Sequence, residues 1–450
     1  MRSLALLLFA GCMATTALAD GYRRFEGHGG PIRGIDISPD GSHALTASFD
    51  NAVGYWSLDD IGEHRAEPLW LDSHDAAANI AIFLPDAAQA LSAGDDFNLI
   101  LWSLADGEAL ATFKGHEGKV LDLDIAPGGT IAASAGWDGV VGLWDMETRQ
   151  AIAMLTGHRA PVQAVRFSPD GKHLYSASSD GTVRRWTVAD HAFDRVEVSH
   201  GFGVNRLALH PTAGWLAYGA LDGGVRILDV ESGEEIADIT SGRQPVLALA
   251  LSRDGGKIAI GDGEGFIHVV DTTTWQTVKD FRAVPRGPVW ALAFDATGQH
   301  VMAGTIQDHA DFWPIDAAVS VDESQTPIRN FHRDPATMTN GERQFARKCS
   351  ICHSLDAASG RRAGPTLHRI FGRKAGTLDG YAYSDALLEA DLVWDEVSLD
   401  KLFDIGPDHY TPGSKMPMQR IVKREDRRDL IEYLRTVTSG NGPQTGEKTE

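Results

Sequence analysis

The chain has 450 residues, 43% of them hydrophobic and 23% charged, a globular composition that excludes wholesale disorder. Its 41 Lys and Arg against 62 Asp and Glu give a formal charge of −21, which disfavours nucleic acid as a partner because phosphate backbones bind cationic surfaces. Three cysteines are too few for a disulfide scaffold.

Residues 1–19 have the pattern of a secretory signal peptide. Arg2 precedes an apolar run over residues 4–9, and the stretch ends in the small residues of Ala17-Leu18-Ala19. We therefore expect export across the inner membrane to the periplasm. An alternative is a lipoprotein signal that is cut before Cys12 and leaves a lipid anchor on that thiol. No later segment has the roughly 18 apolar residues of a spanning helix, so no transmembrane segment is expected in the mature chain.

A sequence repeat follows over residues 20–316. Histidine recurs every 42 to 46 residues, at His28, His74, His116, His158 and His200. A short apolar strand in each unit ends at one register position, occupied by Trp56, Trp102, Trp144, Trp186, Leu228, Val270 and Trp313. Six residues earlier stand Asp50, Asp96, Asp138, Asp180 and Asp222, then Glu264 and Gln307. Alternating strands separated by Gly- and Pro-containing turns indicate an all-β repeat fold.

These units resemble the WD-repeat family of β-propellers, whose blades are four-stranded antiparallel sheets. The resemblance implies seven blades, with residues 22–25 supplying the missing fourth strand of the last unit and closing the ring. It also implies that the recurrent Asp and His hydrogen-bond within each blade to a Ser or Thr and the Trp indole. Units six and seven lack these residues, and we expect packing alone to hold them.

The strand pattern stops at about residue 316. Residues 317–336 are acidic, contain Pro and Thr without periodicity, and are predicted to form a linker. Helical patterns follow over residues 337–437, and residues 438–450 are expected to be a disordered tail. At Cys349-Ser350-Ile351-Cys352-His353 the chain carries C-x-x-C-H, which is typical of covalent haem attachment. A zinc pair and a redox dithiol are the alternatives for the motif taken alone.

The surroundings of this motif resemble class I cytochrome c, an all-α family of small electron carriers. Gly341 and Phe345 match its N-terminal helix, and Leu430 and Tyr433 match its C-terminal helix. The resemblance implies one haem c, bound through thioethers at Cys349 and Cys352, with His353 as the proximal iron ligand. The residues that it implies for orienting the proximal imidazole and binding the haem are Pro365, Arg373, Tyr383, Trp394 and Ser414.

Met416, in Gly413-Ser414-Lys415-Met416-Pro417, matches the family's distal iron ligand. Ligation by His and Met raises the reduction potential and leaves no open iron site, which favours electron transfer. Two rivals lie nearby. Met418 stands where the family usually has an aromatic residue, and His409 could replace the methionine in a bis-histidine site.

The charge is divided unevenly between the two parts. Residues 335–450 contain 17 Lys and Arg and 17 Asp and Glu, whereas residues 20–334 contain 23 basic and 45 acidic residues. Five cations could form a docking ring that steers an acidic redox partner, or they could be ordinary solvated surface: Lys348, Lys415, Arg420, Lys423 and Arg424. The acidic propeller could also compete for such a ring within the chain, because a short linker gives a millimolar effective concentration.

We therefore predict a periplasmic monohaem electron carrier, without enzyme activity of its own, whose propeller binds a partner protein. One alternative is a propeller–cytochrome oxidoreductase with a second cofactor in the propeller. Another is a haem-based redox sensor, which would require Met416 to dissociate readily. Fold analogy alone does not decide among them.

Overall fold

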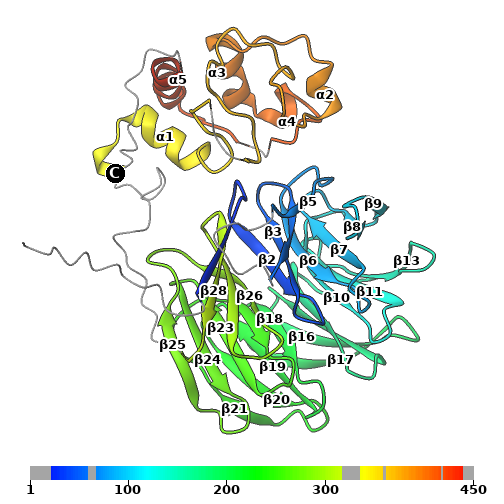
Figure 1. Ribbon diagram of the computed structural model, residues 1–450. Coiled ribbons are helices and arrows are strands. Elements are labelled where there is room, and N and C mark those ends of the chain that lie inside the picture. The colour runs from blue at the N-terminus through cyan, green and yellow to red at the C-terminus, as the bar shows by residue number, and fades with distance from the viewer. Residues whose placement is uncertain (1–21, 59–66, 317–334, 358–360, 417–418, 439–450) are drawn as a thin grey trace, which may run out of the picture.

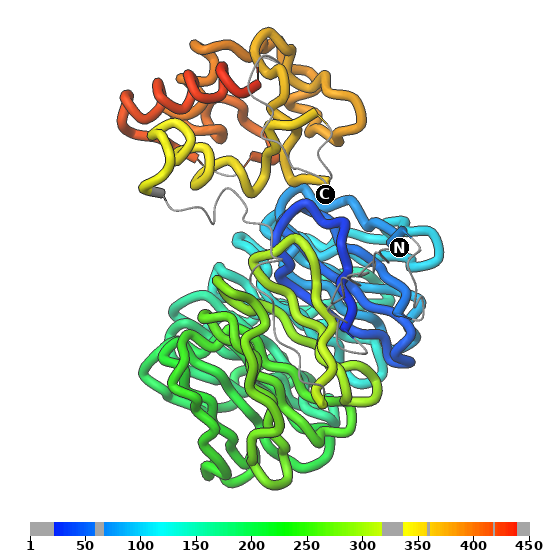
Figure 2. Tube along the Cα trace, turned by 60° about the vertical axis from the view of Figure 1, so that its left-hand side comes forward, coloured from blue at the N-terminus to red at the C-terminus, as the bar shows by residue number. Residues whose placement is uncertain are grey.

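The structure is a computed structural model that describes residues 22–58, 67–316, 335–357, 361–416 and 419–438. A ring of β-sheets precedes a small helical domain, which lies next to the N-terminal, blue part of the ring (Figure 1). Figure 2 shows the same two parts after a turn of the molecule. The predicted signal peptide, Cys12, nearly all of the predicted linker, Met418 and the tail from residue 439 lie outside the described residues.

Seven four-stranded antiparallel sheets form the blades. Blade one contains β2 (Ile32–Ile37), β3 (His43–Ser48), β4 (Val53–Ser57) and β5 (Leu69–Leu71); blade two contains β6 (Ala78–Phe83), β7 (Gln89–Gly94), β8 (Leu99–Ser103) and β9 (Ala109–Phe113). Blade three contains β10 (Val120–Ile125), β11 (Ile131–Gly136), β12 (Val141–Asp145) and β13 (Gln150–Leu155); blade four contains β14 (Val162–Phe167), β15 (His173–Ser178), β16 (Thr182–Thr187) and β17 (Ala192–Ser199). Blade five contains β18 (Val204–Leu209), β19 (Trp215–Ala220), β20 (Val225–Asp229) and β21 (Glu235–Asp238); blade six contains β22 (Val246–Leu251), β23 (Lys257–Asp262), β24 (Phe266–Asp271) and β25 (Thr277–Arg282). Blade seven contains β26 (Val289–Phe294), β27 (His300–Thr305), β28 (His309–Pro314) and β1 (Arg23–Glu26).

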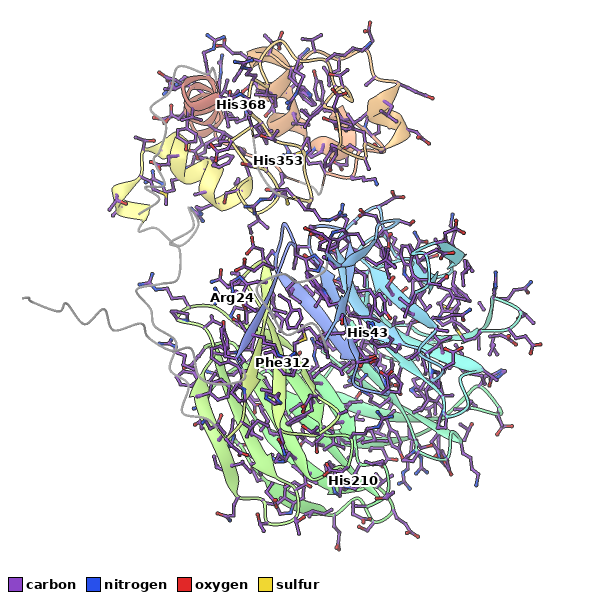
Figure 3. The ribbon with its side chains drawn as sticks, viewed as in Figure 1. Arg24, His43, His210, Phe312, His353 and His368 are labelled. Carbon is purple, nitrogen blue, oxygen red and sulfur yellow. The ribbon has the colours of Figure 1, made fainter. Side chains whose placement is uncertain are left out.

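Blade seven closes the ring with strands from both ends of the domain. β1 pairs antiparallel with β28, so that Phe25 lies opposite Ala310. The Tyr22 hydroxyl donates to Asp311 at 2.6 Å, and Arg24 Nε donates to the same carboxylate at 2.9 Å. Figure 3 shows Arg24 beside this closing sheet. The predicted seven-bladed fold and its closure by the N-terminal strand are confirmed.

Apolar side chains fill the spaces between successive blades. One cluster joins Leu45 and Val53 of blade one to Phe83 and Trp102 of blade two, and equivalent clusters join the later blades. Each sheet therefore has both faces covered by its neighbours, and burial of this apolar surface holds the ring together.

Buried polar networks repeat in blades one to four, as the family resemblance implied. In blade one, His28 Nδ1 lies 2.9 Å from Asp50, and His28 Nε2 lies 2.7 Å from Thr46 Oγ1. Trp56 Nε1 donates to the same hydroxyl at 2.7 Å. Ser92, Ser134 and Ser176 take the place of Thr46 in the next three blades. The recurrent His and Asp thus satisfy each other inside the sheets.

The expectation that packing alone holds blades six and seven is wrong. In blade six, Arg243 donates to Asp262 at 2.7 Å and to Asp280 at 2.8 Å. Blade seven is held by the Asp311 network at its closing strand. Among the described residues Trp313 Nε1 has no hydrogen-bond partner, because Ala303 stands where the early blades have Ser or Thr. These blades replace the repeated network with ion pairs of their own.

The shared hydroxyl of a blade gives a testable stability effect. Ser134→Ala is expected to lower the free energy of unfolding of the propeller by about 1–3 kcal/mol, because His116 and Trp144 both lose a buried partner. Ala303→Ser, the reverse change at the equivalent position, should not destabilise, since the hydroxyl can accept from Trp313 Nε1. Denaturant unfolding followed by tryptophan fluorescence compares the two variants. Equal destabilisation by both would contradict this account.

The helical domain comprises η3 (Pro335–Thr337), α1 (Asn340–Lys348), α2 (Asp385–Leu388), α3 (Glu396–Ile405), α4 (Pro407–Tyr410) and α5 (Arg424–Thr438). α1 and α5 cross at Gly341, where a Cβ would lie only 2.1 Å from the carbonyl oxygen of Asp429. The Phe345 and Tyr433 rings meet near this crossing, with centroids 5.9 Å apart. Among the helices of the described residues, none combines the length and hydrophobicity needed to cross a bilayer.

Candidate haem-binding site

The C-x-x-C-H motif forms one tight turn at the end of α1. The Cys352 and His353 backbone N–H groups donate to the Cys349 carbonyl at 3.1 and 2.8 Å. Cys349 caps the helix and is buried in the domain core, whereas Cys352 is partly exposed. The turn therefore brings two thiols and one imidazole together, as attachment through two thioethers with an adjacent iron ligand requires.

The imidazole of His353 is held by the loop that contains Pro365. Nδ1 lies 2.7 Å from the Pro365 carbonyl oxygen. Because a carbonyl only accepts, Nδ1 carries the proton, and Nε2 is left with a lone pair that can bind iron. Burial lowers the pKa of His353; the Pro365 carbonyl opposes this shift and nearby Arg373 adds to it. The ring is thus kept in the neutral form that a metal ligand needs.

Gly364 allows this loop to press against the imidazole. A Cβ at this position would lie 2.3 Å from His353 Cε1, far inside van der Waals contact. The Gly364 N–H also donates to the Cys352 carbonyl at 2.8 Å. The loop and the haem-attachment turn are therefore one packed unit.

The two thiols do not have the properties of a redox dithiol. Burial raises the pKa of Cys349 to about 12, with a smaller contribution from neighbouring Cys352, and burial also raises the pKa of Cys352. Reactive cysteines have lowered pKa values, because the thiolate is the nucleophile. This environment favours the haem-attachment interpretation of the motif over a catalytic pair.

The loop that contains Gly364 and Pro365 is called the proximal loop. Three of the predicted haem-binding residues follow it in the chain: Arg373, Tyr383 and Trp394. Arg373 donates to the carbonyl oxygens of Thr366 at 2.7 Å and of His368 at 3.2 Å. Trp394 packs against the domain core, and its backbone N–H donates to the Arg373 carbonyl at 2.9 Å. Burial raises the pKa of Tyr383, an effect that Arg373 opposes. The role of these three residues in haem binding stays a prediction. In the structure Arg373 stabilises the proximal loop through its hydrogen bonds to the loop carbonyls.

The distal segment brings Met416 to the same core. Met416 is half-buried and packs against the apolar cluster that contains Cys349. Ser414 Oγ lies 3.2 Å from the Thr411 hydroxyl, which helps to fix the turn before the methionine. The rival His409 is on the surface, with a side chain 70% exposed and 2.9 Å from Asp408. This placement favours Met416 over His409 as the distal ligand.

Three residues that the sequence analysis did not single out also shape the site. The Tyr381 hydroxyl donates to the Ala363 carbonyl, and burial raises the pKa of Tyr381 to about 12. Arg361 and Arg362 begin the proximal loop and point to the propeller. The only sequence signal for this contact with the propeller is the pair of consecutive arginines shortly before Gly364-Pro365.

The residues present fit a covalently bound haem c. Two thiols follow one helix, a neutral imidazole is oriented with Nε2 available, a glycine makes room behind it, and a methionine lines the same core. This arrangement on a few short helices defines a class I c-type cytochrome domain, joined in this chain to a seven-bladed propeller. We call residues 335–438 the haem domain.

Comparison with known proteins agrees with both parts. A family model described as cytochrome c matches residues 338–438, and one described as WD domain, G-beta repeat, matches residues 21–57, 107–145 and 149–187. Cytochrome c of Sesamum indicum is 38% identical over 107 residues, which cover 23% of this chain and 94% of the relative. Cytochrome c of Chlamydomonas reinhardtii is 40% identical over 113 residues, which cover 25% of this chain and 100% of the relative. Through its C-terminal domain, the chain belongs to the cytochrome c family.

The glycine behind His353 provides a direct test of the site. In Gly364→Ala the imidazole must move by about 1 Å to restore normal carbon contacts, so axial ligation should weaken. We expect a partial loss of low-spin haem in the absorption spectrum. Gly341→Ala is the control: it should cost about 1–3 kcal/mol of stability through the α1–α5 crossing and leave the spectrum of the folded protein unchanged. A normal spectrum for Gly364→Ala would contradict the placement of the loop.

Proposed function

We propose that this protein is a periplasmic, monohaem c-type electron-transfer protein whose propeller serves as a platform for partner proteins. The observation that carries the proposal is the His353 imidazole, fixed by Pro365 beside two attachment thiols in one turn. When bound, haem c supplies one-electron redox chemistry. His353 and Met416 would both bind its iron, which favours electron transfer over chemistry on an open iron.

The propeller has exposed apolar side chains that are suited to protein contacts. Trp137 is 55% exposed, Phe202 is 60% exposed and Leu221 is 44% exposed. Trp137 directly precedes Asp138 and Leu221 directly precedes Asp222, so the two side chains lie on equivalent turns of blades three and five. Exposed aromatic residues in such positions are typical anchors of protein interfaces.

The periplasmic location rests on the sequence of residues 1–19. A basic residue, an apolar run and a small-residue cleavage site are the features of an exported chain. Release of the protein by osmotic shock, with an N-terminus at Asp20, is expected. Recovery in the membrane fraction with lipid on Cys12 would favour the anchored alternative.

Quantifying the cofactors separates the carrier from the oxidoreductase. Haem, iron and organic cofactors are measured in the purified full chain. We expect one haem and one iron per chain and no second cofactor. A stoichiometric organic cofactor or a second metal in the propeller would instead support a propeller–cytochrome enzyme and contradict the carrier proposal.

A further inference from the structure

The loops that hold His353 and Met416 also contact the propeller. Arg361 and Arg362 begin the loop behind His353, and Lys415 directly precedes Met416. All three cationic side chains reach propeller residues. In Figure 3 His353 lies nearer to the propeller than His368 does, so the haem-attachment side of the domain faces the ring.

The contacted residues form one patch around blade one. Arg362 Nη1 donates to the Gly29 carbonyl at 3.0 Å, and Lys415 Nζ lies 3.2 Å from Asp75 Oδ1. We call this patch the blade-one face, and its members are Gly29, Asp50, Trp70, Asp72 and Asp75.

Arg361 contacts acidic and aromatic side chains of the patch. Its guanidinium binds the Asp72 carboxylate, and its Nε lies 3.5 Å from Asp50 Oδ2. Its Cζ also lies 4.9 Å from the centre of the Trp70 ring, within cation–π range. The face thus provides carboxylates and an aromatic ring for a group of cations.

Gly29 lies directly against the backbone of the haem domain. A Cβ at this position would lie 1.6 Å from the Arg361 carbonyl oxygen and 2.4 Å from Arg362 Cα. Any side chain at position 29 would therefore push the haem domain away.

The blade itself does not require a glycine there. The Gly29 N–H donates to the blade carboxylate of Asp50 at 2.7 Å. The same bond in blades two to four is made by the backbone of Asp75, Glu117 and Arg159. Gly29 also has no left-handed backbone angle, unlike Gly27. The missing side chain at this position is explained by the haem domain that lies against it.

We propose that the blade-one face is a docking site for the chain's own haem domain, and that an acidic external redox partner must displace it. The inference rests on the proposed electron-transfer function. Residues 20–334, most of which form the propeller, carry 45 acidic against 23 basic residues, so the propeller can act as an internal mimic of an acidic partner. Exposed ion pairs are weak and screened by salt, but the tether keeps the two surfaces at a millimolar effective concentration. Docking is therefore reversible.

Reduction of the full-chain holoprotein by ferrous EDTA, a dianionic one-electron reductant, reports on this docking. The rate is measured by stopped flow at ionic strengths of about 10 mM and about 300 mM, which span strong to weak screening. For the wild type we expect the rate to rise with salt, because docking hides the three cations behind an acidic surface. In Gly29→Gln the rate at low salt should be at least about threefold higher and should fall with salt, because the free cations attract the reductant.

Each variant has a matched control at the equivalent position of another blade. Arg159→Gln places the same residue on blade four and should behave as the wild type. Asp75→Lys removes the Lys415 partner without altering Gly29 and should behave as Gly29→Gln, since Arg159 shows that this position accepts a cation. Glu117→Lys is its control on blade three.

The outcomes distinguish the two proposals. All variants should show the same haem c spectrum and reversible reduction. A protein without a haem c spectrum or without reversible reduction would overturn the proposed function. The docking site alone would be overturned by a different result. In that case the spectra are normal, but Gly29→Gln and Asp75→Lys both match the wild type in reduction rate and in the sign of its salt dependence.

Discussion

Met416→Ala is expected to abolish the near-infrared sulfur-to-iron charge-transfer band of the oxidised protein completely. Met416 packs against the core cluster that contains Cys349. Among the described methionines it is the nearest in sequence to the turn that Ser414 and Thr411 form. Loss of a methionine ligand should also lower the reduction potential, since the thioether stabilises the reduced iron. Absorption spectroscopy and an equilibrium redox titration measure both effects.

Met418→Ala is the matched control, because it removes the other methionine of the same segment. The band should survive this change. If it disappears in Met418→Ala and persists in Met416→Ala, the assignment of the distal ligand is wrong. A band lost only in His409 variants is not expected, because that side chain is on the surface and pairs with Asp408.

Asp311→Ala should destabilise the propeller by about 3 kcal/mol or more, because it removes the carboxylate at the centre of the ring closure. Tyr22 and Arg24 both donate to Asp311, and His309 Nε2 lies 3.6 Å from it. Without the carboxylate, Tyr22 and Arg24 lose their shared acceptor, whereas β1 keeps its pairing with β28 and the burial of Phe25. Denaturant unfolding measures the change.

Asp194→Ala is the control for a surface ion pair. Asp194 accepts from Arg185 at 2.6 Å but its side chain is 30% exposed, so the loss should be about 0–1 kcal/mol. Equal effects of the two substitutions would contradict a special role for the closing network.

The pH dependence of the Asp311 effect has a defined window. Burial raises the pKa of Asp311, but His309, Arg24 and Tyr22 outweigh it and hold the pKa below its ordinary value. Its stabilising contribution is therefore present above about pH 4 and lost as the pH falls through the folded pKa. Burial lowers the pKa of His309, but Asp308 and Asp311 raise it overall. The stabilising contribution of protonated His309 is therefore complete below about pH 6.5 and is lost as the pH rises through the folded pKa. The difference between wild type and Asp311→Ala should be largest between about pH 4 and 6.5.

Much of the propeller was predictable because its pattern repeats. The Trp register gave the blade spacing, and Trp56, Trp102 and Trp144 occupy equivalent strand positions opposite Ala44, Ala90 and Ala132. The networks of blades six and seven were missed because they do not repeat. Arg243 reaches Asp280, which is 37 residues away, and Asp311 meets Tyr22 across 289 residues. No local spacing encodes such pairs.

The haem site was partly predictable for a similar reason. C-x-x-C-H lies in one turn, so its spacing alone brings the thiols and imidazole together. The loop contact between Pro365 and His353 came from the family resemblance and is present at 2.7 Å. The contacts of Arg361 and Lys415 depend on how two domains meet, which no periodicity within either domain reveals.

A redox titration of the purified full chain, followed at the haem absorption bands, tests the electron-transfer account most directly. We predict one fully reversible one-electron transition, with covalent haem and a methionine-ligated oxidised spectrum on either side of it. A transition that is irreversible, or that takes up more than one electron per chain, would contradict a monohaem carrier.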